Sequence, residues 1–237
     1  MSGAPAPGRS WVYEDIVSAI PGLELPPRYA IAIQFLGFEA IVLSLAAVYQ
    51  RPSAAVVGTV AVIVASTGSA AMVTIAREIR IANPSPRYSR LLFGSNVEVV
   101  LGVLAYAALS TYLVITGGDG GLFESVLGPE PPAPAVFVAF VLAWDVSYRI
   151  GVGWWASLIG CWRSFSERVT AEAAASYRRA DLVTLGFASV QLLLVPVIAS
   201  ERLLALAVVG HVAAVFTVSG LSLLALERRK VSPPESA

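Results

Sequence analysis

Three residue types that carry much of the chemistry of membrane proteins are nearly missing from this chain, which has one cysteine, one histidine and one lysine. Cys161 alone cannot form a disulfide or a redox thiol pair within one chain. His211 alone cannot supply the two axial ligands of a bis-histidine haem or the ligands of a three-histidine metal site. Lys230 lies beyond the last apolar segment, which excludes a retinal Schiff base inside a membrane helix. We therefore expect neither a metal nor a cofactor.

Charged side chains are also scarce. They make up 14% of the residues, against roughly 25% in ordinary soluble domains. Hydrophobic residues make up 57% and the mean hydropathy is +0.74. The formal net charge is zero, so no basic field suggests nucleic acid as a partner. This composition excludes a soluble globular domain and indicates a multi-pass membrane protein.

The motifs of several membrane activities are absent from the sequence. It has no P-loop, no Gly-rich dinucleotide fingerprint, no Gly-x-Ser-x-Gly elbow and no potassium-channel filter sequence. Prenyl and CDP-alcohol transferases use aspartate clusters near the cytoplasmic face, and the corresponding loops here carry only Glu78, Glu167, Glu172 and Asp181. An enzyme is therefore the less favoured class, and no catalytic residue is assigned.

Six apolar segments are long enough to cross a bilayer, because a hydrocarbon core of about 30 Å needs roughly 20 helical residues. They cover approximately residues 29–49, 53–79, 91–115, 134–162, 182–200 and 203–226. The sequence thus predicts an all-α bundle of six transmembrane helices over 29–226. Residues 1–28 form an N-terminal tail and residues 227–237 a cytoplasmic C-terminal tail. Pro196 is expected to bend the far end of the fifth span.

Two segments outside the spans also predict structure. Residues 11–20 can place Trp11, Ile16 and Ile20 on one face before Pro21 and Gly22 end the helix. This amphipathic helix is too short to span, so it either lies in the membrane interface or caps the bundle. Residues 163–179 are expected to form a polar connector that contains a short helix over 171–175.

The basic residues predict the orientation, since short cytoplasmic loops of membrane proteins are rich in arginine and lysine. Two of them, Arg51 and Arg202, fall on one side. Thirteen fall on the other: Arg9, Arg28, Arg77, Arg80, Arg87, Arg90, Arg163, Arg168, Arg178, Arg179, Arg228, Arg229 and Lys230. This distribution predicts that both termini are cytoplasmic and that the protein lies in the cell membrane. The loop over 117–135, which is acidic and has no basic residue, fits the outer side.

The span over 134–162 organises the candidate site because it carries Asp145 and Arg149 near its middle. Charges at that depth cost roughly 2.5–3.5 kcal/mol each on insertion scales. The spacing i, i+4 lets the two side chains pair on one helix face. Two other spans offer the carboxylates of Glu39 and Glu98. Three acids and one arginine sum to −2, so we expect a protonated carboxylate or a bound cation.

This arrangement favours transport of a small solute or ion, with proton coupling as an option. In this hypothesis Glu39 and Glu98 exchange protons or a cation, while Arg149 holds Asp145 and binds an anionic group of the substrate. Further candidates for the pathway are Tyr148, Gln191 and His211. The expected partners are the lipid bilayer and an unidentified small solute or ion, with a second copy or a membrane complex as further options.

Each candidate also has a structural interpretation. Asp145 and Arg149 can form an ion pair that only fixes helix packing. Glu39 and Glu98 can be neutral and hydrogen-bonded to neighbouring helices, and His211 can be a satisfied interior histidine. Gly94 and Gly102 stand one turn on either side of Glu98, which predicts a ridge that another backbone approaches closely.

The alternative function is a non-catalytic structural or assembly subunit of a membrane complex. A central water-accessible cavity would favour transport, whereas a dry buried network would favour the structural subunit. A lateral polar cleft open to lipid would favour lipid binding or lipid-modifying chemistry.

Two runs carry a resemblance to known sequences, RYAIAIQFLGFEAIVLSLAAVY from Arg28 and RLLFGSNVEVVLGVLAY from Arg90. Together with the use of arginine in place of lysine, they resemble an uncharacterised family of multi-pass membrane proteins from haloarchaea. The resemblance covers residues 11–226. It implies an archaeal membrane protein and no particular activity.

Overall fold

The structure, a computed structural model, describes residue 11 and residues 26–116, 121–228 and 230–231. Six of its segments are long and apolar enough to cross a membrane, which confirms the predicted all-α bundle. The described residues include one strand pairing, in which β1 (Val169–Thr170) runs parallel to β2 (Lys230–Val231). Apart from Trp11, the amphipathic helix predicted over 11–20 lies outside the described residues.

The helices in chain order are α2 (Pro27–Val48), α3 (Pro52–Ile81), α4 (Pro86–Phe93), α5 (Val97–Thr116), α6 (Leu122–Leu127), α7 (Ala133–Ser166), α8 (Ala171–Gln191), α9 (Leu194–Val197) and α10 (Arg202–Arg228). Four of them, α2, α3, α4 and α7, have proline in the first two helical positions. Proline suits this position because its ring fixes a helical φ and the backbone N–H it lacks would have no partner there. The prolines that separate the apolar runs therefore also set where the helices begin.

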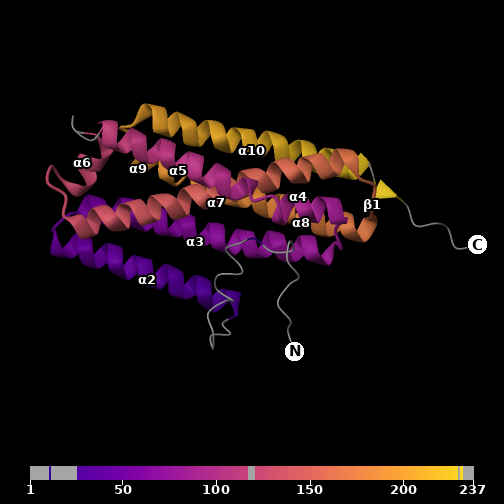
Figure 1. Cartoon of the computed structure of the whole chain (residues 1–237), viewed down its shortest axis with the longest axis horizontal. Coiled ribbons are helices and arrows are strands. Elements are labelled where there is room, and N and C mark those ends of the chain that lie inside the picture. The colour runs from indigo at the N-terminus through magenta and orange to yellow at the C-terminus, as the bar shows by residue number, and fades with distance from the viewer. Residues whose placement is uncertain (1–10, 12–25, 117–120, 229, 232–237) are drawn as a thin grey trace, which may run out of the picture.

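The helices form an elongated bundle in which α7 is central (Figure 1). α7 packs against α3, α5, α8 and α10, whereas α2 packs mainly against α3 at the edge of the bundle. The burial of the apolar windows agrees, with 44% of residues buried for α7 and 11% for α2. The helix that carries Asp145 and Arg149 thus lies in the protein interior, and α2 presents most of its surface to lipid.

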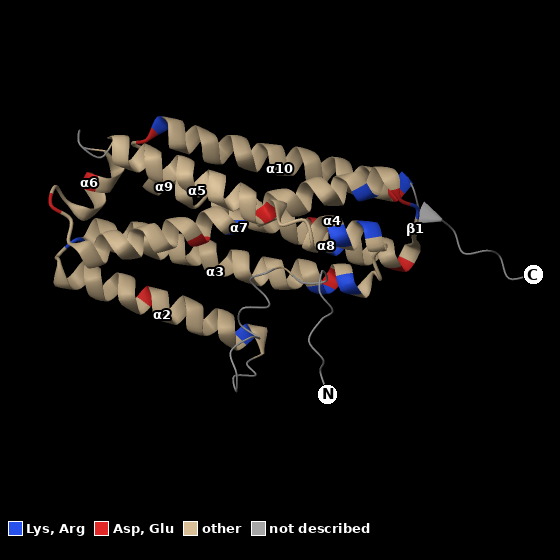
Figure 2. Cartoon of the chain, in the orientation of Figure 1, with Lys and Arg blue, Asp and Glu red and all other residues tan. Residues whose placement is uncertain are grey.

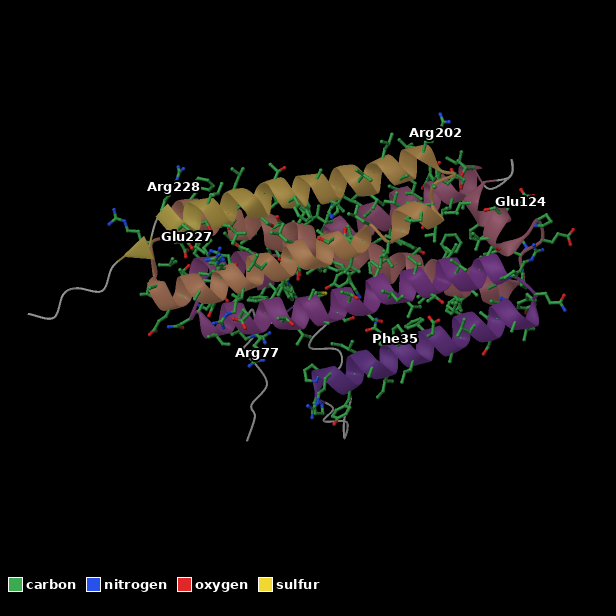
Figure 3. The ribbon with its side chains drawn as sticks, turned by 180° about the vertical axis from the view of Figure 1, so that it is seen from behind. Phe35, Arg77, Glu124, Arg202, Glu227 and Arg228 are labelled. Atoms are coloured by element: carbon green, nitrogen blue, oxygen red, sulfur yellow. The ribbon has the colours of Figure 1, made fainter. Side chains whose placement is uncertain are left out.

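Most charged residues lie toward the ends of the bundle, some acidic ones lie along its middle, and most arginines lie at the end near β1 (Figure 2). Arg77, Glu227 and Arg228 lie toward this end in the reverse view, whereas Arg202 and Glu124 lie at the opposite end (Figure 3). Ion pairs join helices at the arginine-rich end, with Arg179 3.3 Å from Glu78 and Arg178 3.5 Å from Glu227. The loops therefore have the charge asymmetry that the sequence suggested.

The predicted connector over 163–179 is wrong. α7 continues through Ser166 and α8 begins at Ala171, so that residues 167–170 alone join them. The Thr170 side chain caps α8 by accepting a hydrogen bond from the Ala173 backbone N–H. The short helix expected over 171–175 is the start of a 21-residue helix. The polar residues that suggested a loop lie on the exposed face of this helix or at buried positions where they contact side chains of other helices.

The third span is interrupted, which corrects the predicted glycine ridge. α4 ends at Phe93, α5 begins at Val97, and Asn96 between them has a φ of +55°. Gly94 is the C-cap of α4 and does not share a helix face with Gly102. The Leu91 carbonyl at the break accepts hydrogen bonds from Ser95 Oγ at 2.7 Å and Trp155 Nε1 at 3.0 Å. These donors satisfy a backbone group that the helix end would leave unpaired.

The fifth span is also interrupted, and here the expected effect of Pro196 is confirmed. α8 ends at Gln191, and α9 follows after two residues in a turn. Proline cannot donate to the carbonyl four residues earlier, and its ring crowds that carbonyl, so a regular helix cannot continue through Leu192. The interruption places Gln191 at the end of a helix within the span.

α5 and α7 cross through a pair of glycines. A Cβ atom added to Gly151 would lie 2.9 Å from the Gly102 backbone nitrogen, and one added to Gly102 would lie 3.0 Å from Tyr148 Cα. The two backbones therefore approach more closely than side chains would allow, as small residues permit in membrane helices. The close approach of another backbone, predicted for the glycines on either side of Glu98, is therefore found at Gly102.

Candidate functional site

The seven predicted site residues do not gather at one place. Asp145 and Arg149 form a pair, Glu39 and Glu98 lie on other helices, and Tyr148 packs between α5 and α7. Gln191 and His211 line a cavity that includes none of the other five. The candidates are therefore considered separately.

Asp145 and Arg149 form a hydrogen-bonded ion pair inside the bundle. Arg149 Nη2 lies 2.7 Å from Asp145 Oδ1, and the Arg149 side chain is fully buried. Gln34 Nε2 donates to Asp145 Oδ2 at 2.9 Å, and Ser69 Oγ donates to Gln34 Oε1 at 2.8 Å. This chain of contacts joins α2, α3 and α7. Because a buried pair persists only when both charges are satisfied, the geometry supports the structural interpretation of these residues.

Gly68 makes room for the arginine. A Cβ atom there would lie 2.6 Å from Arg149 Cδ and 2.9 Å from Phe187 Cζ. The Arg149 Nη1 group also reaches Met72 Sδ at 3.6 Å. The side chain thus passes between α3 and α8 through a gap that only glycine leaves open.

Glu39 contacts the neighbouring helix. Thr59 Oγ1 donates to Glu39 Oε1 at 2.7 Å, so the carboxyl group links α2 to α3. Glu39 Oε2 is buried and has no hydrogen-bond partner among the described residues. One oxygen of this carboxyl group is therefore bonded across the contact between α2 and α3, and the other is free of described partners.

Glu98 is a buried acid on α5. It lies in the first turn of α5, directly after the interruption in the third span, and its exposed fraction is 0%. Neither carboxylate oxygen has a hydrogen-bond partner among the described residues. The start of a helix favours a negative charge, yet an ionised carboxylate without a partner is costly to bury. These features keep Glu98 as a candidate for the predicted protonated or cation-bound carboxylate.

Tyr148 serves packing. Its Cα lies close to Gly102, its side chain is 4% exposed, and its ring stacks on Trp144 with centroids 6.0 Å apart. The residue fills the α5–α7 contact.

A cavity of about 620 Å³ lies in the part of the bundle near α6 and α9. α2, α3, α5, α7, α8 and α10 also contribute to its walls. The walls are mainly aliphatic, and the polar or amphipathic lining residues are Tyr49, Arg51, Tyr112, Ser147, Gln191 and His211. No aspartate or glutamate is among the described lining residues. The cavity is therefore suited to an apolar molecule and poorly suited to an ion.

Two residues that line the cavity each have a buried polar atom without a partner among the described residues. Gln191 is 1% exposed, and its Oε1 has no hydrogen-bond partner among the described residues. The same holds for the buried Nε2 of His211, whose ring packs edge-on against Trp154 at 5.8 Å. Buried polar groups are normally hydrogen-bonded, so these atoms are candidates for contact with a ligand. The interpretation of His211 as a satisfied interior histidine is not supported at Nε2.

Sequence reasoning missed a second buried ion pair. Arg163 Nη2 lies 3.3 Å from Asp181 Oδ2, and Ser222 Oγ donates to the same oxygen at 2.8 Å. The Arg163 guanidinium stacks on the Tyr177 ring at 4.0 Å. Tyr177, Asp181 and Thr184 follow the i, i+4, i+7 pattern of one helix face, so extending the fifth span toward its N-terminus would have found this cluster.

Glu201 was also missed, at the opposite end of the bundle. Its Oε1 accepts a hydrogen bond from the Leu122 backbone N–H at 2.8 Å, and its Oε2 accepts one from the Tyr112 hydroxyl. Glu201 therefore ties the start of α10 to α5 and α6, beside the cavity. Glu201 lies between two apolar spans, and nothing in the sequence there indicates whether its side chain forms these hydrogen bonds or is exposed to water.

The comparisons with known proteins identify a family. No group of three or more His, Cys, Asp or Glu residues in the described part of the chain is placed to hold a metal ion. No curated protein and no solved structure matches the chain. One family model matches residues 6–222, which is most of the sequence. The chain therefore belongs to the DUF7530 family, a family of unknown function.

Proposed function

We propose that this integral membrane protein binds a mainly apolar molecule dissolved in the membrane. The observation that carries the proposal is the aliphatic cavity of about 620 Å³ with the unsatisfied atoms of Gln191 and His211 in its lining. Ligand pockets have volumes of roughly 300–1,000 Å³, with apolar walls and a few polar groups that orient the ligand. An apolar ligand would reach such a cavity from the bilayer without crossing water.

Photolabelling tests this binding. A diazirine-labelled hexadecanol in nanodiscs should label cavity residues such as Leu142 and Leu204, and Ala143→Phe, which fills part of the cavity, should reduce this labelling about tenfold. Such a loss corresponds to about 1.4 kcal/mol of binding energy. The matched control is Ala213→Phe, because Ala213 is exposed on α10 and does not line the cavity. Equal labelling of both variants would show that the probe occupies only the surrounding lipid.

Glu98 supports a second candidate function, proton-coupled transport of a small solute or ion. Transporters place substrate and ion sites at the ends of interrupted membrane helices, and ionisable groups within spans are typical of proton relays. Glu98 combines both features, since it is buried, lacks partners among the described residues and follows the break at 94–96. The part that Glu39 has in this hypothesis finds less support, because Glu39 bonds to Thr59 on another helix.

Proton flux in proteoliposomes tests this second candidate. Under an imposed potential and pH gradient, Glu98→Gln should lower the flux at least about tenfold. It should leave the melting temperature within a few degrees of that of the wild type, because no hydrogen bond of Glu98 is lost. Glu39→Gln is the matched control and should keep the flux. A wild-type flux no larger than that of protein-free vesicles would reject transport of protons.

We further propose that the protein lies in the cell membrane with both termini in the cytoplasm. The support is the gathering of arginines at the end near β1 (Figure 2), together with the positive-inside tendency of membrane proteins. The alternative of a structural subunit draws support from the Asp145–Arg149 network, which is buried and hydrogen-bonded to Gln34.

A further inference from the structure

We propose that the ligand of the cavity carries a neutral hydroxyl head group, as in a long-chain or prenyl alcohol or a quinol, and that Gln191 and His211 bind this head. The inference rests on the proposed binding function and names its ligand class. The hydroxyl would donate its proton to Gln191 Oε1 and form a second hydrogen bond with His211 Nε2.

The two side chains come from neighbouring helices. Ala188, one turn before Gln191 on α8, packs in the same cluster as Val212, which follows His211 on α10. Trp154 on α7 contacts both this cluster and the His211 ring. Gln191 is also the last residue of α8 before the interruption, and the chain beyond it continues along the cavity with Leu194 and Ile198. The two side chains therefore belong to helices that pack together and line the same cavity.

The chemistry of the two atoms selects the head group. An amide oxygen only accepts hydrogen bonds, so the ligand must supply a donor, which excludes ketones, ethers and esters as sole partners of Gln191. Imidazole Nε2 donates or accepts according to its tautomer. A hydroxyl group both donates and accepts, so it satisfies Gln191 and either tautomer of His211 at once.

Charged heads fit this position less well. An ammonium would find no carboxylate among the described lining residues. A carboxylate would place its oxygens against the Gln191 oxygen. The cationic side chain among the described lining residues is Arg51. Arg51 precedes α3, at the end of that helix away from the arginine-rich loops. Two charges separated in an apolar cavity are costly. The neutral hydroxyl needs no such partner.

Competition among molecules of one chain length tests the head group. Hexadecanol, hexadecyl methyl ether, hexadecane and palmitate would each compete with the diazirine probe on the full-length protein in nanodiscs. Hexadecanol should compete about tenfold better than the ether or the alkane, since neither of these can donate a hydrogen bond to the buried Gln191 acceptor. Gln191→Leu should abolish this advantage and His211→Phe should reduce it. Thr217→Val, on the exposed side of α10, should preserve it.

The outcomes separate the inference from the function on which it rests. Equal competition by hexadecanol, the ether and hexadecane would overturn the hydroxyl head and leave the apolar site in place. Strongest competition by palmitate, lost in Arg51→Gln, would replace the hydroxyl with a carboxylate head. If none of the four molecules competes and the probe does not label the cavity, the binding function itself fails. The comparison in the wild-type protein needs no variant, so a misfolded Gln191→Leu protein would not remove the test.

Discussion

Replacement of Asp145 by alanine is expected to lower the free energy of unfolding by about 3–5 kcal/mol, the usual cost of removing one partner of a buried ion pair. The variant would leave the Arg149 guanidinium inside the bundle without the carboxylate that lies 2.7 Å away. It would also remove the acceptor of the Gln34 amide, which holds α2 against α7. Equilibrium unfolding in mixed micelles, followed by circular dichroism, measures the change.

Two further variants separate charge from packing. Asp145→Asn keeps an acceptor for Gln34 but loses the charge, so it should be destabilised less than the alanine variant. The double variant Asp145→Leu and Arg149→Met removes both charges and fills similar volume, and it should recover most of the loss because apolar replacements of buried pairs are often neutral or stabilising. An alanine variant as stable as the wild type would show that Asp145 does not neutralise Arg149.

Gly151→Leu is expected to separate α5 from α7 and to cost about 3 kcal/mol or more, at or beyond the usual cost of overpacking a core. Its Cβ would meet the Gly102 backbone at 2.9 Å. A backbone atom cannot move aside as a flexible side chain would, so the helix crossing itself must open. Melting temperature and proteolysis of the purified protein would both report the loss.

Glycines elsewhere in the same bundle provide matched controls. Gly37 and Gly210 have nothing within 4 Å of an added Cβ atom, so leucine there should change stability by less than about 0.5 kcal/mol, as for surface substitutions. If Gly151→Leu matched these controls, the close crossing of α5 and α7 would be wrong.

The spans were predictable because the bilayer imposes a simple rule on length and composition. Long apolar runs, and prolines such as Pro52 at their starts, set α2, α3, α7 and α10 within a few residues. The start of α8 at Ala171 was missed because its first turns are polar. The pairing of Asp145 with Arg149 was equally accessible, since a spacing of four residues on one helix is local information.

Features that depend on how helices meet were not predictable in the same way. The break at 94–96 falls on Gly-Ser-Asn, a short polar step inside a long apolar run. It is set by the left-handed backbone of Asn96 and by the Trp155 donor from another helix. Arg163 is buried because Asp181 and Ser222 converge on it from α8 and α10. The cavity depends on how far apart the helices pack, and hydropathy and periodicity do not determine that spacing.

The position of each partner of a buried charge has a consequence for biosynthesis. Membrane helices leave the translocon in chain order. A charged side chain whose partner lies on a much later helix must therefore enter the lipid before it is neutralised. Here Arg149 finds Asp145 within its own helix, and Arg163 finds Asp181 on the next one. Glu39 likewise finds Thr59 on the helix that follows it. These groups can therefore meet their partners while successive helices are being synthesised, whereas Glu98 has no hydrogen-bond partner among the residues that the structure describes.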